Sequence, residues 1–429
     1  MAHTMSAKPE TAPYRAGFSP AGSLAEKRRE AFARFEELGF PTRRDEAWRF
    51  TNLRPLQDKA FAPGTATPGA PPALEPYFFA GETHRIVLVN GHFTPALSKI
   101  GGLPKGVTLG SAAEIAARQP ALAERLLDRT DLVGGQAFAS LNAALFADGF
   151  VLALDPGVAL EKPVEIVYWG DAAERSFHLR NLIQLGAGSR ATIIESYAGS
   201  GHYWTNAVTL VDVASRAALR QAKLQHEAND AIHFGQVRAS IAADARYESF
   251  VLTLGGRLSR HDSFATFAGE GAACGLFGAY LLKGEQEATN ATFVDHAVPK
   301  CATSEVFKGV VDERAHGVFL GKIAVRPQAQ KTDAHQLNKN LLLSARANVD
   351  TKPELEILAD DVKCSHGATV GDLDENALFY LAARGIPADE ARRMLIEAFA
   401  ADAIDCIEDD TTLRAHLLKH VQRWLGRED

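Results

Sequence analysis

The sequence has 429 residues, a length that suggests two or three domains and excludes a single small module. Apolar residues make up 46% and charged residues 23%, which excludes a disordered chain and a coiled coil. No apolar run approaches the roughly 18–20 residues that a membrane span needs. The net charge of −7 argues against nucleic-acid binding.

The first twenty residues lack the hydrophobic segment of a secretory signal, so we expect a cytoplasmic protein. The cysteines agree with that expectation, because they are scattered, form no CxxC pair and are typical of reduced thiols. We expect Cys274 in a glycine-rich turn and Cys301 after Pro299 and Lys300, each as a packing residue or an incidental thiol. We expect Cys406 to pack within a helix.

Residues 1–150 predict a mostly helical N-terminal domain with a long loop. Residues 23–38 have helical hydrophobic spacing, with Ser23 as N-cap and Gly39 and Pro41 at the end. Residues 61–76 read FAPGTATPGAPPALEP and indicate a loop. Residues 84–93 are typical of a strand, and residues 111–148 favour helices.

Residues 151–371 differ in composition and predict strands, because they contain short runs rich in β-branched and aromatic residues. No pattern for a helix of ten or more residues separates these runs. This argues against a βαβ sheet, because its parallel strands need helical crossovers.

A weak repeat runs through this middle region. A small or polar turn followed by an apolar strand starts at positions 188, 214, 243 and 269, which are separated by 26, 29 and 26 residues. Such a period, with several short strands per repeat, favours a β-solenoid in which coils stack around one continuous core. An antiparallel sandwich is the alternative.

Residues 372–429 predict a compact helical unit. Asp374 is placed to cap a first helix that Gly385 closes, and Pro387 suits the first position of a second helix reaching about residue 407. A last helix runs from Thr411 or Thr412 to about residue 425. On it, His416 and His420 are four residues apart, which fits an exposed helix surface better than a pair of metal ligands.

The sequence contains partial matches to two nucleotide-binding motifs, and each lacks a feature that the motif requires. Residues 186–191 read GAGSRA, but a strand-like run follows where a dinucleotide site needs a helix. Gly321 and Lys322 resemble the end of a phosphate loop, but Ile323 replaces the residue that would hold magnesium. We therefore expect no ATP-binding motif, and no ATP hydrolysis by this chain itself.

One pair of residues suggests metal chemistry. Cys364 and His366 are two residues apart, so on a β-strand their side chains share one face. A thiolate and an imidazole together suit zinc or an iron–sulfur centre, but two ligands are too few for a closed site. On spacing alone, a buried cysteine beside a structural histidine is the simpler interpretation.

The sequence around this pair resembles the SufB/SufD family of the SUF iron–sulfur cluster assembly system. The segments that carry the resemblance are TKPELEI at 351–357, DDVKCSHGATVG at 360–371 and LFYL at 378–381 with RGI at 384–386. At the N-terminal end, GFPTR at 39–43 and EAWRFT at 46–51 are similar to the family as well. The resemblance covers almost the whole chain, and the Cys-Ser-His-Gly sequence at 364–367 favours the D-type branch.

The resemblance implies a mainly β protein with a right-handed parallel β-helix between N- and C-terminal helical domains. It implies a scaffold role in cluster assembly and iron acquisition, without enzymatic activity of the chain's own. The partners that it implies are a SufB-type subunit at the end of the β-helix and a SufC-type ATPase on the C-terminal helices. It also makes His366 a ligand and Cys364 an interface thiol of a transient iron–sulfur cluster, which the SufB-type subunit completes. No cofactor is then held stably by the chain alone.

Several alternatives stay open at this point. The chain fits a B-type primary scaffold less well, because of the sequence at 364–367. A carbohydrate-active β-helix enzyme needs a ladder of carboxylates or calcium ligands that the sequence lacks. A stand-alone metal carrier would use Cys364 and His366 by itself, and a homodimer is expected if unpaired strand edges find a second copy.

Overall fold

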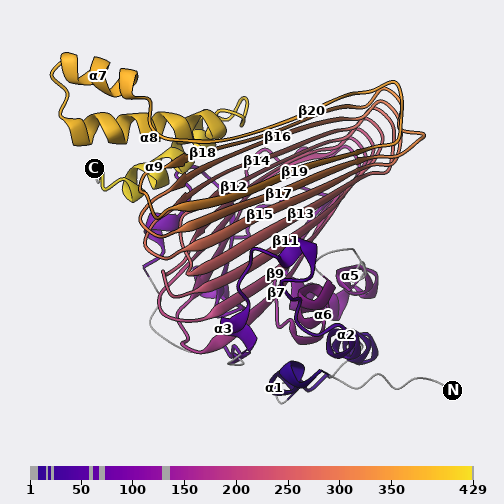
Figure 1. The fold of residues 1–429 in the computed structure, drawn as a ribbon. Coiled ribbons are helices and arrows are strands. Elements are labelled where there is room, and N and C mark those ends of the chain that lie inside the picture. The colour runs from indigo at the N-terminus through magenta and orange to yellow at the C-terminus, as the bar shows by residue number, and fades with distance from the viewer. Residues whose placement is uncertain are drawn as a thin grey trace.

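The computed structural model describes residues 8–15, 18–20, 24–57, 61–66, 73–127 and 136–427. Two long sheets face each other and form a solenoid, with helices at both ends of the chain packed outside it (Figure 1). Successive strands alternate between the sheets, so each coil contributes one strand to each. The mainly β fold with flanking helices and the solenoid are confirmed, and the antiparallel sandwich is wrong.

The first sheet contains strands from both ends of the solenoid, and its long strands are parallel. Among the described residues, β4 and β5 are the only strands of this sheet that pair in the antiparallel sense. The strands, in sheet order, are β19 (Asn348–Ile357), β17 (His316–Val325), β15 (Glu287–His296), β13 (Leu258–Phe267), β11 (Ile232–Ile241), β9 (Trp204–Val213), β7 (Arg175–Leu185), β5 (Phe150–Leu154) and β4 (Val107–Ser111), with β1 (Ala62–Pro63) beside β7.

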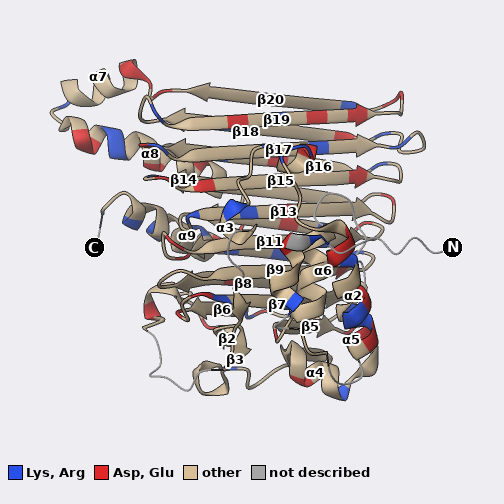
Figure 2. Cartoon of the chain, turned by 60° about the horizontal axis from the view of Figure 1, so that its bottom comes forward, with Lys and Arg blue, Asp and Glu red and all other residues tan. Residues whose placement is uncertain are grey.

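The second sheet faces the first and ends at the last strand of the chain. Its strands, in sheet order, are β20 (Lys363–Gly371), β18 (Asp333–Leu342), β16 (Ala302–Val311), β14 (Ala273–Leu282), β12 (Arg246–Thr253), β10 (Ala218–His226), β8 (Arg190–Gly199), β6 (Val164–Gly170), β2 (His84–Val89) and β3 (His92–Phe93). Figure 2 shows the strands as stacked rungs with β20 outermost.

The repeat that the sequence predicts corresponds to one column of turns. Gly188, Arg216, Asp244 and Gly271 occupy equivalent places in successive coils, and each has a positive φ between 56° and 74°. The amides of Gly188, Arg216 and Asp244 donate to the turn of the next coil, as in Gly188 N to Ser215 O at 2.9 Å. The turn therefore selects glycine or a polar residue that tolerates the left-handed conformation.

Apolar side chains fill much of the space between the two sheets. Strand alternation turns every second residue inward, and parallel pairing in register stacks like positions from coil to coil. Ile166, Ile193, Tyr247 and Phe319 belong to the largest buried cluster, which runs through the interior. The core is thus a continuous column rather than a single central cluster.

The N-terminal helices cover the outer face of the first sheet. Phe40, Trp48 and Phe138 pack there against Trp204 and Phe234 of the sheet. The helices of this region are the 3₁₀ helices η1 (Pro9–Thr11), η2 (Glu46–Trp48), η3 (Glu75–Tyr77) and η4 (Pro95–Leu97), and α1 (Ala12–Arg15), α2 (Ala25–Leu38), α3 (Arg54–Gln57), α4 (Ala112–Arg118), α5 (Pro120–Leu126) and α6 (Gln136–Leu145). Ser23, the predicted cap of α2, lies outside the described residues, as do residues 67–72 of the predicted loop.

The C-terminal helices are α7 (Glu375–Ala383), α8 (Ala388–Ile404) and α9 (Thr411–Trp424). Asp374 caps α7 by accepting a 2.8 Å hydrogen bond from Asn376 N, as predicted. Pro387 is the N-cap of α8 instead of its first residue, and α8 ends three residues before the predicted 407 because the chain turns there. The domain boundaries at residues 150 and 371 stay predictions; β2 and β4 precede the first of them and belong to the two sheets.

Candidate functional site

The candidate site lies on β20, at the open end of the solenoid. This strand pairs with β18 along one edge, and no strand in the described part of the chain covers its other edge. The backbone groups of that edge are therefore available to another strand or to solvent. The same is true of β19, the last strand of the first sheet.

Cys364 and His366 share the inward face of β20. Cys364 is half-buried and packs against the core column, which fixes the face that it presents to the interior. His366 follows two residues later, so strand alternation places it on the same side. The register sets Cys364 beside Ala334 and His366 beside Gln336 of β18. The predicted strand and shared face are confirmed, and the metal-ligand roles of the pair stay predictions.

The environment of Cys364 favours the neutral thiol. Burial, followed by the nearby carboxylate of Asp333, raises the pKa of the Cys364 thiol above its ordinary value. Because metals bind the thiolate, a metal at this site must displace the proton. His366 is exposed to solvent at the open end, so a ligand arriving from outside the chain can reach it.

The outward face of β20 carries a second histidine contact that the sequence did not indicate. His335 of β18 has Nδ1 2.7 Å from the Ser365 hydroxyl and Nε2 2.8 Å from an Asp333 carboxylate oxygen. These residues lie on the opposite side of the sheet from Cys364. Over the described ranges, no three His, Cys, Asp or Glu side chains form a group that could hold a metal ion.

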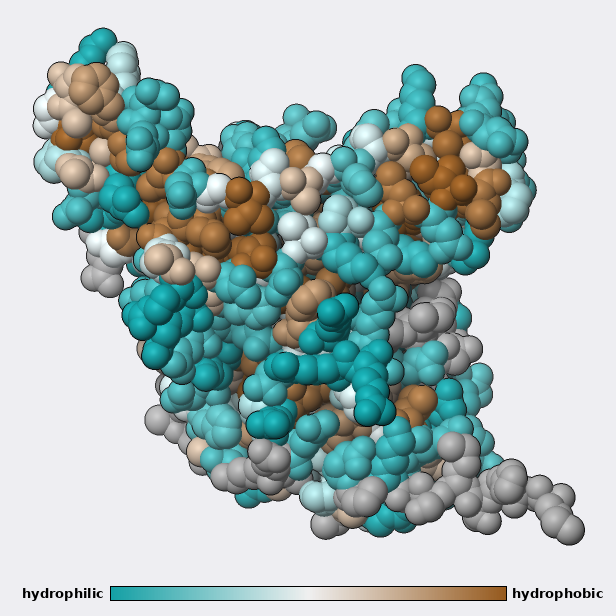
Figure 3. Space-filling model, viewed as in Figure 1, coloured by the Kyte–Doolittle hydropathy of each residue, from teal (hydrophilic) through white to brown (hydrophobic). Residues whose placement is uncertain are grey.

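Two separate hydrophobic patches flank this open end. Figure 3 shows one over the C-terminal helices and one near the turns of the last coils, with hydrophilic surface between them. Near the turn from β19 to β20, Ile357 is 40% exposed and Leu358 is 54% exposed. Exposed apolar side chains beside a free strand edge are typical of a protein–protein contact.

The other patch belongs to α7. This helix has no buried residue, and its Phe379 and Tyr380 are 76% and 58% exposed. By contrast, α8 and α9 are anchored to the outer face of the second sheet through Ile396, Leu413 and Leu417. The C-terminal unit thus holds α7 away from the solenoid on a fixed base (Figure 1).

The prediction of an exposed His416 and His420 is wrong. Both imidazoles are buried, and they pack against Phe79 and Tyr77 from the N-terminal part of the chain. Burial is the main cause that lowers the pKa of His416 to about 4 and that of His420 to about 2. Their i, i+4 spacing reflects the packed face of α9 and not its surface.

The remaining cysteines are free thiols. Cys274 lies within β14 and not in a turn, where it is buried in the core column, and burial raises the pKa of its thiol. Cys301 is buried in the same column. Cys406 follows α8 in a turn instead of lying within a helix. Gly321 and Lys322 lie inside β17, where the extended backbone cannot form a phosphate loop.

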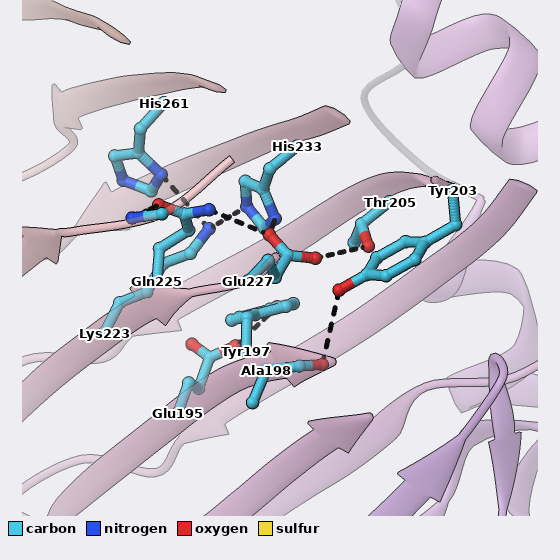
Figure 4. A network of polar contacts seen from close by, with 11 residues as sticks. Glu195, Tyr197, Ala198, Tyr203, Thr205, Lys223, Gln225, Glu227, His233 and His261 are labelled. Atoms are coloured by element: carbon cyan, nitrogen blue, oxygen red, sulfur yellow. Dashed lines mark hydrogen bonds and ion pairs between the residues drawn. The ribbon is translucent and has the colours of Figure 1, made fainter. Parts of the chain in front are cut away.

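Sequence reasoning also missed a polar cluster inside the solenoid, on coils far from β20 (Figure 4). Lys223 Nζ lies 2.7 Å from His233 Nε2 and 3.4 Å from His261 Nδ1. His233 Nδ1 lies 2.7 Å from a carboxylate oxygen of Glu227. Burial lowers the pKa of Lys223 to about 8, against the opposing effect of nearby carboxylates. The cluster bridges the two sheets across the interior.

The geometry defines a class of protein: a β-solenoid with an unpaired end that carries a cysteine and a histidine on its inner face. Comparison with known protein families identifies the family that has these features. Residues 168–399 match the family model described as SUF system FeS cluster assembly, SufBD core domain, and residues 19–166 match the SufBD protein N-terminal region. The chain belongs to the SufB/SufD family of iron–sulfur cluster assembly proteins.

Curated relatives extend this result along the chain. An iron–sulfur cluster assembly SufBD family protein of Synechocystis is 33% identical over 398 residues, covering 90% of this chain and 87% of the relative. The iron–sulfur cluster assembly protein SufD of Escherichia coli is 32% identical over 397 residues, covering 90% of each. Within the described part of the chain, no helix is both long and apolar enough to cross a membrane.

Proposed function

We propose that this chain is a non-catalytic scaffold subunit that offers half of a cluster-assembly site to a SufB-type subunit in the cytoplasm. The observation that carries the proposal is the placement of Cys364 and His366 on the inner face of an unpaired last strand. The iron–sulfur cluster is cargo here: it assembles at the junction of the two subunits, takes His366 and Cys364 as ligands from this side, and leaves when the junction opens.

The free edges of β19 and β20 support a SufB-type subunit as the partner at this end. A second solenoid that stacked on them would pair the open backbone groups and cover Ile357 and Leu358. A cluster site that is divided between two subunits can also release the finished cluster. Two ligands bind weakly alone, and the remaining ligands arrive only with the partner.

The exposed aromatic side chains of α7 support docking of a SufC-type ATPase. Phe379 and Tyr380 form an exposed aromatic surface on a helix that has no fully buried residue. ATP-driven movement of the ATPase would then act on the C-terminal helices. Because α8 packs on β14 and β16, that movement could reach the coils that end in the half-site.

Reciprocal substitutions separate the two docking surfaces. Leu358→Ser should weaken association with the SufB-type subunit and leave the ATPase bound, and Phe379→Ser should do the reverse. Each variant serves as the control for the other, since both replace an exposed apolar side chain and should change the free energy of unfolding by less than about 0.5 kcal/mol. Co-purification of the three tagged subunits under anaerobic conditions measures both contacts.

The same experiment separates the scaffold from its alternatives. Equal retention of both partners in both variants would contradict the assigned surfaces. A wild-type chain that purified alone and bound iron tightly would favour a stand-alone carrier. A chain that formed only a dimer of itself, lost in Leu358→Ser, would show that a second copy occupies the open end.

A further inference from the structure

Three inward positions form one column beneath the open end of the solenoid. Glu305 of β16 is in register with Gln336 of β18, and Gln336 is in register with His366 of β20. Paired positions of parallel strands present their side chains to the same face. Glu305 and Gln336 are 1% and 2% exposed, whereas His366 is exposed. A buried amide therefore lies one strand below His366.

The amide of Gln336 is held in place on one side only. Its Nε2 donates a 2.8 Å hydrogen bond to Glu305, whose same carboxylate oxygen accepts a second bond of 2.8 Å from the Thr292 hydroxyl. The space it occupies depends on Gly321, because a Cβ there would lie 2.2 Å from Gln336 Nε2. The contacts of Nε2 thus orient the amide and leave its oxygen free.

The Gln336 Oε1 atom is buried and has no hydrogen-bond partner among the residues that the structure describes. A buried carbonyl oxygen without a partner costs on the order of 1–3 kcal/mol. Native proteins rarely leave such a group unpaired without a reason. The nearest inward position on the open side belongs to His366, which carries a ring N–H and is itself exposed.

We propose that Gln336 is a positioning residue for His366: its Oε1 accepts the N–H of one ring nitrogen when the partner subunit closes the end of the solenoid. This inference rests on the proposed function, in which His366 binds the cluster. A histidine that binds a metal through one nitrogen almost always donates the N–H of the other nitrogen to a fixed acceptor. The bond sets the tautomer and aims the free nitrogen at the junction.

The test measures iron(II) binding to the assembled complex under anaerobic conditions, with Gln336→Met as the variant. Methionine has nearly the same length and no carbonyl oxygen. We expect the His366-dependent affinity for iron(II) to fall 10–100-fold, with subunit association unchanged. The double variant Glu305→Gln with Gln336→Glu restores an acceptor beneath His366 and should recover the wild-type affinity.

Gln221 provides a matched control. It is an inward, buried amide in the same column of register positions, donating a 2.6 Å hydrogen bond to Glu195 and accepting one of 2.8 Å from Tyr247. It lies on β10, far from the open end. Gln221→Met should leave iron(II) affinity unchanged, so a loss in both variants would show a general structural effect and contradict the positioning role.

A second variant keeps the test valid if Gln336→Met does not fold. Gly321→Ala adds a methyl group that displaces the Gln336 amide without changing its chemistry, and it should also weaken iron(II) binding. Wild-type affinity in either variant, together with loss of binding in His366→Ala, would refute the role of Gln336 and leave the proposed function intact. Wild-type affinity in His366→Ala would overturn both.

Discussion

Lowering the pH should loosen α9, because its two histidines are buried in the neutral form. His416 and His420 have ring centroids 5.0 Å apart, and His226 of β10 lies 5.9 Å from His420. Burial keeps the folded pKa of His416 at about 4 and that of His420 at about 2, with nearby Lys419 and Arg423 acting in the same direction. Protonation of either ring would place a charge in an apolar contact.

The size of the effect follows from the difference between folded and unfolded pKa values. An unfolded histidine has a pKa of about 6.5. At about pH 5, which is about 1.5 units below that value, protonation stabilises the unfolded state by about 2 kcal/mol per histidine. The folded state gains almost none at that pH. Stability is therefore fully present above about pH 6.5 and is lost as the pH falls toward the folded pKa values.

Hydrogen exchange of α9 at about pH 7.5 and pH 5 measures this loss locally, which matters because a solenoid need not unfold in one step. In His420→Leu, the difference in opening free energy between the two pH values should shrink by about 2 kcal/mol relative to wild type. His335→Leu, on an exposed outer face, is the control and should leave the difference unchanged. An unchanged pH dependence in His420→Leu would refute the reasoning.

Two other substitutions test the packing of the interior. Gly309→Ala should destabilise the solenoid by about 1–3 kcal/mol in urea unfolding, because its Cβ would lie 2.3 Å from both Tyr280 and Asn340. Gly371→Ala is the control, because a Cβ there has no atom within 4 Å. Burial raises the folded pKa of Glu305 to about 7, so ionisation of this carboxyl should destabilise the wild-type fold as the pH rises. Glu305→Gln cannot ionise and should not show this loss. The wild type should lose about 3 kcal/mol more than the variant between about pH 4 and pH 8, and equal slopes in unfolding titrations would count against the buried ionisation.

The solenoid could be predicted from the sequence because its turns impose a local requirement. Each coil needs a left-handed residue at one place, and that need leaves a visible spacing of glycine and polar residues, as at Gly188 and Gly271. The caps and ends of α7 were equally local, since Asp374 and Gly385 act on adjacent backbone. The right-handed sense of the coil stays a prediction from the family.

The histidines of α9 could not be placed from the sequence. Their burial depends on Tyr77 and Phe79, which lie more than three hundred residues earlier in the chain. The position of Lys223 inside the solenoid was hidden for the same reason. Lys223 fits there because Gly235 has no Cβ, which would lie 2.4 Å from the Lys223 Nζ. It also needs a neutral His233 as hydrogen-bond acceptor. Neither condition leaves a periodic pattern.

The candidate site was predicted in part. Strand alternation placed Cys364 and His366 on one face, and the structure shows that the face points inward. The residues beneath them were missed, because Gln336 and Glu305 carry no motif and acquire their arrangement only through the register of three strands. The open end itself is a property of the whole stack.

Cluster assembly on the complete complex tests the central claim most directly. The complex with the SufB-type and SufC-type subunits would be reconstituted anaerobically with iron and sulfide, and cluster formation followed by visible absorption. We predict that His366→Ala loses cluster formation while all three subunits stay associated, and that His335→Ala, which removes an exposed histidine from the outer face, matures clusters as the wild type does. Normal maturation in His366→Ala would contradict the half-site.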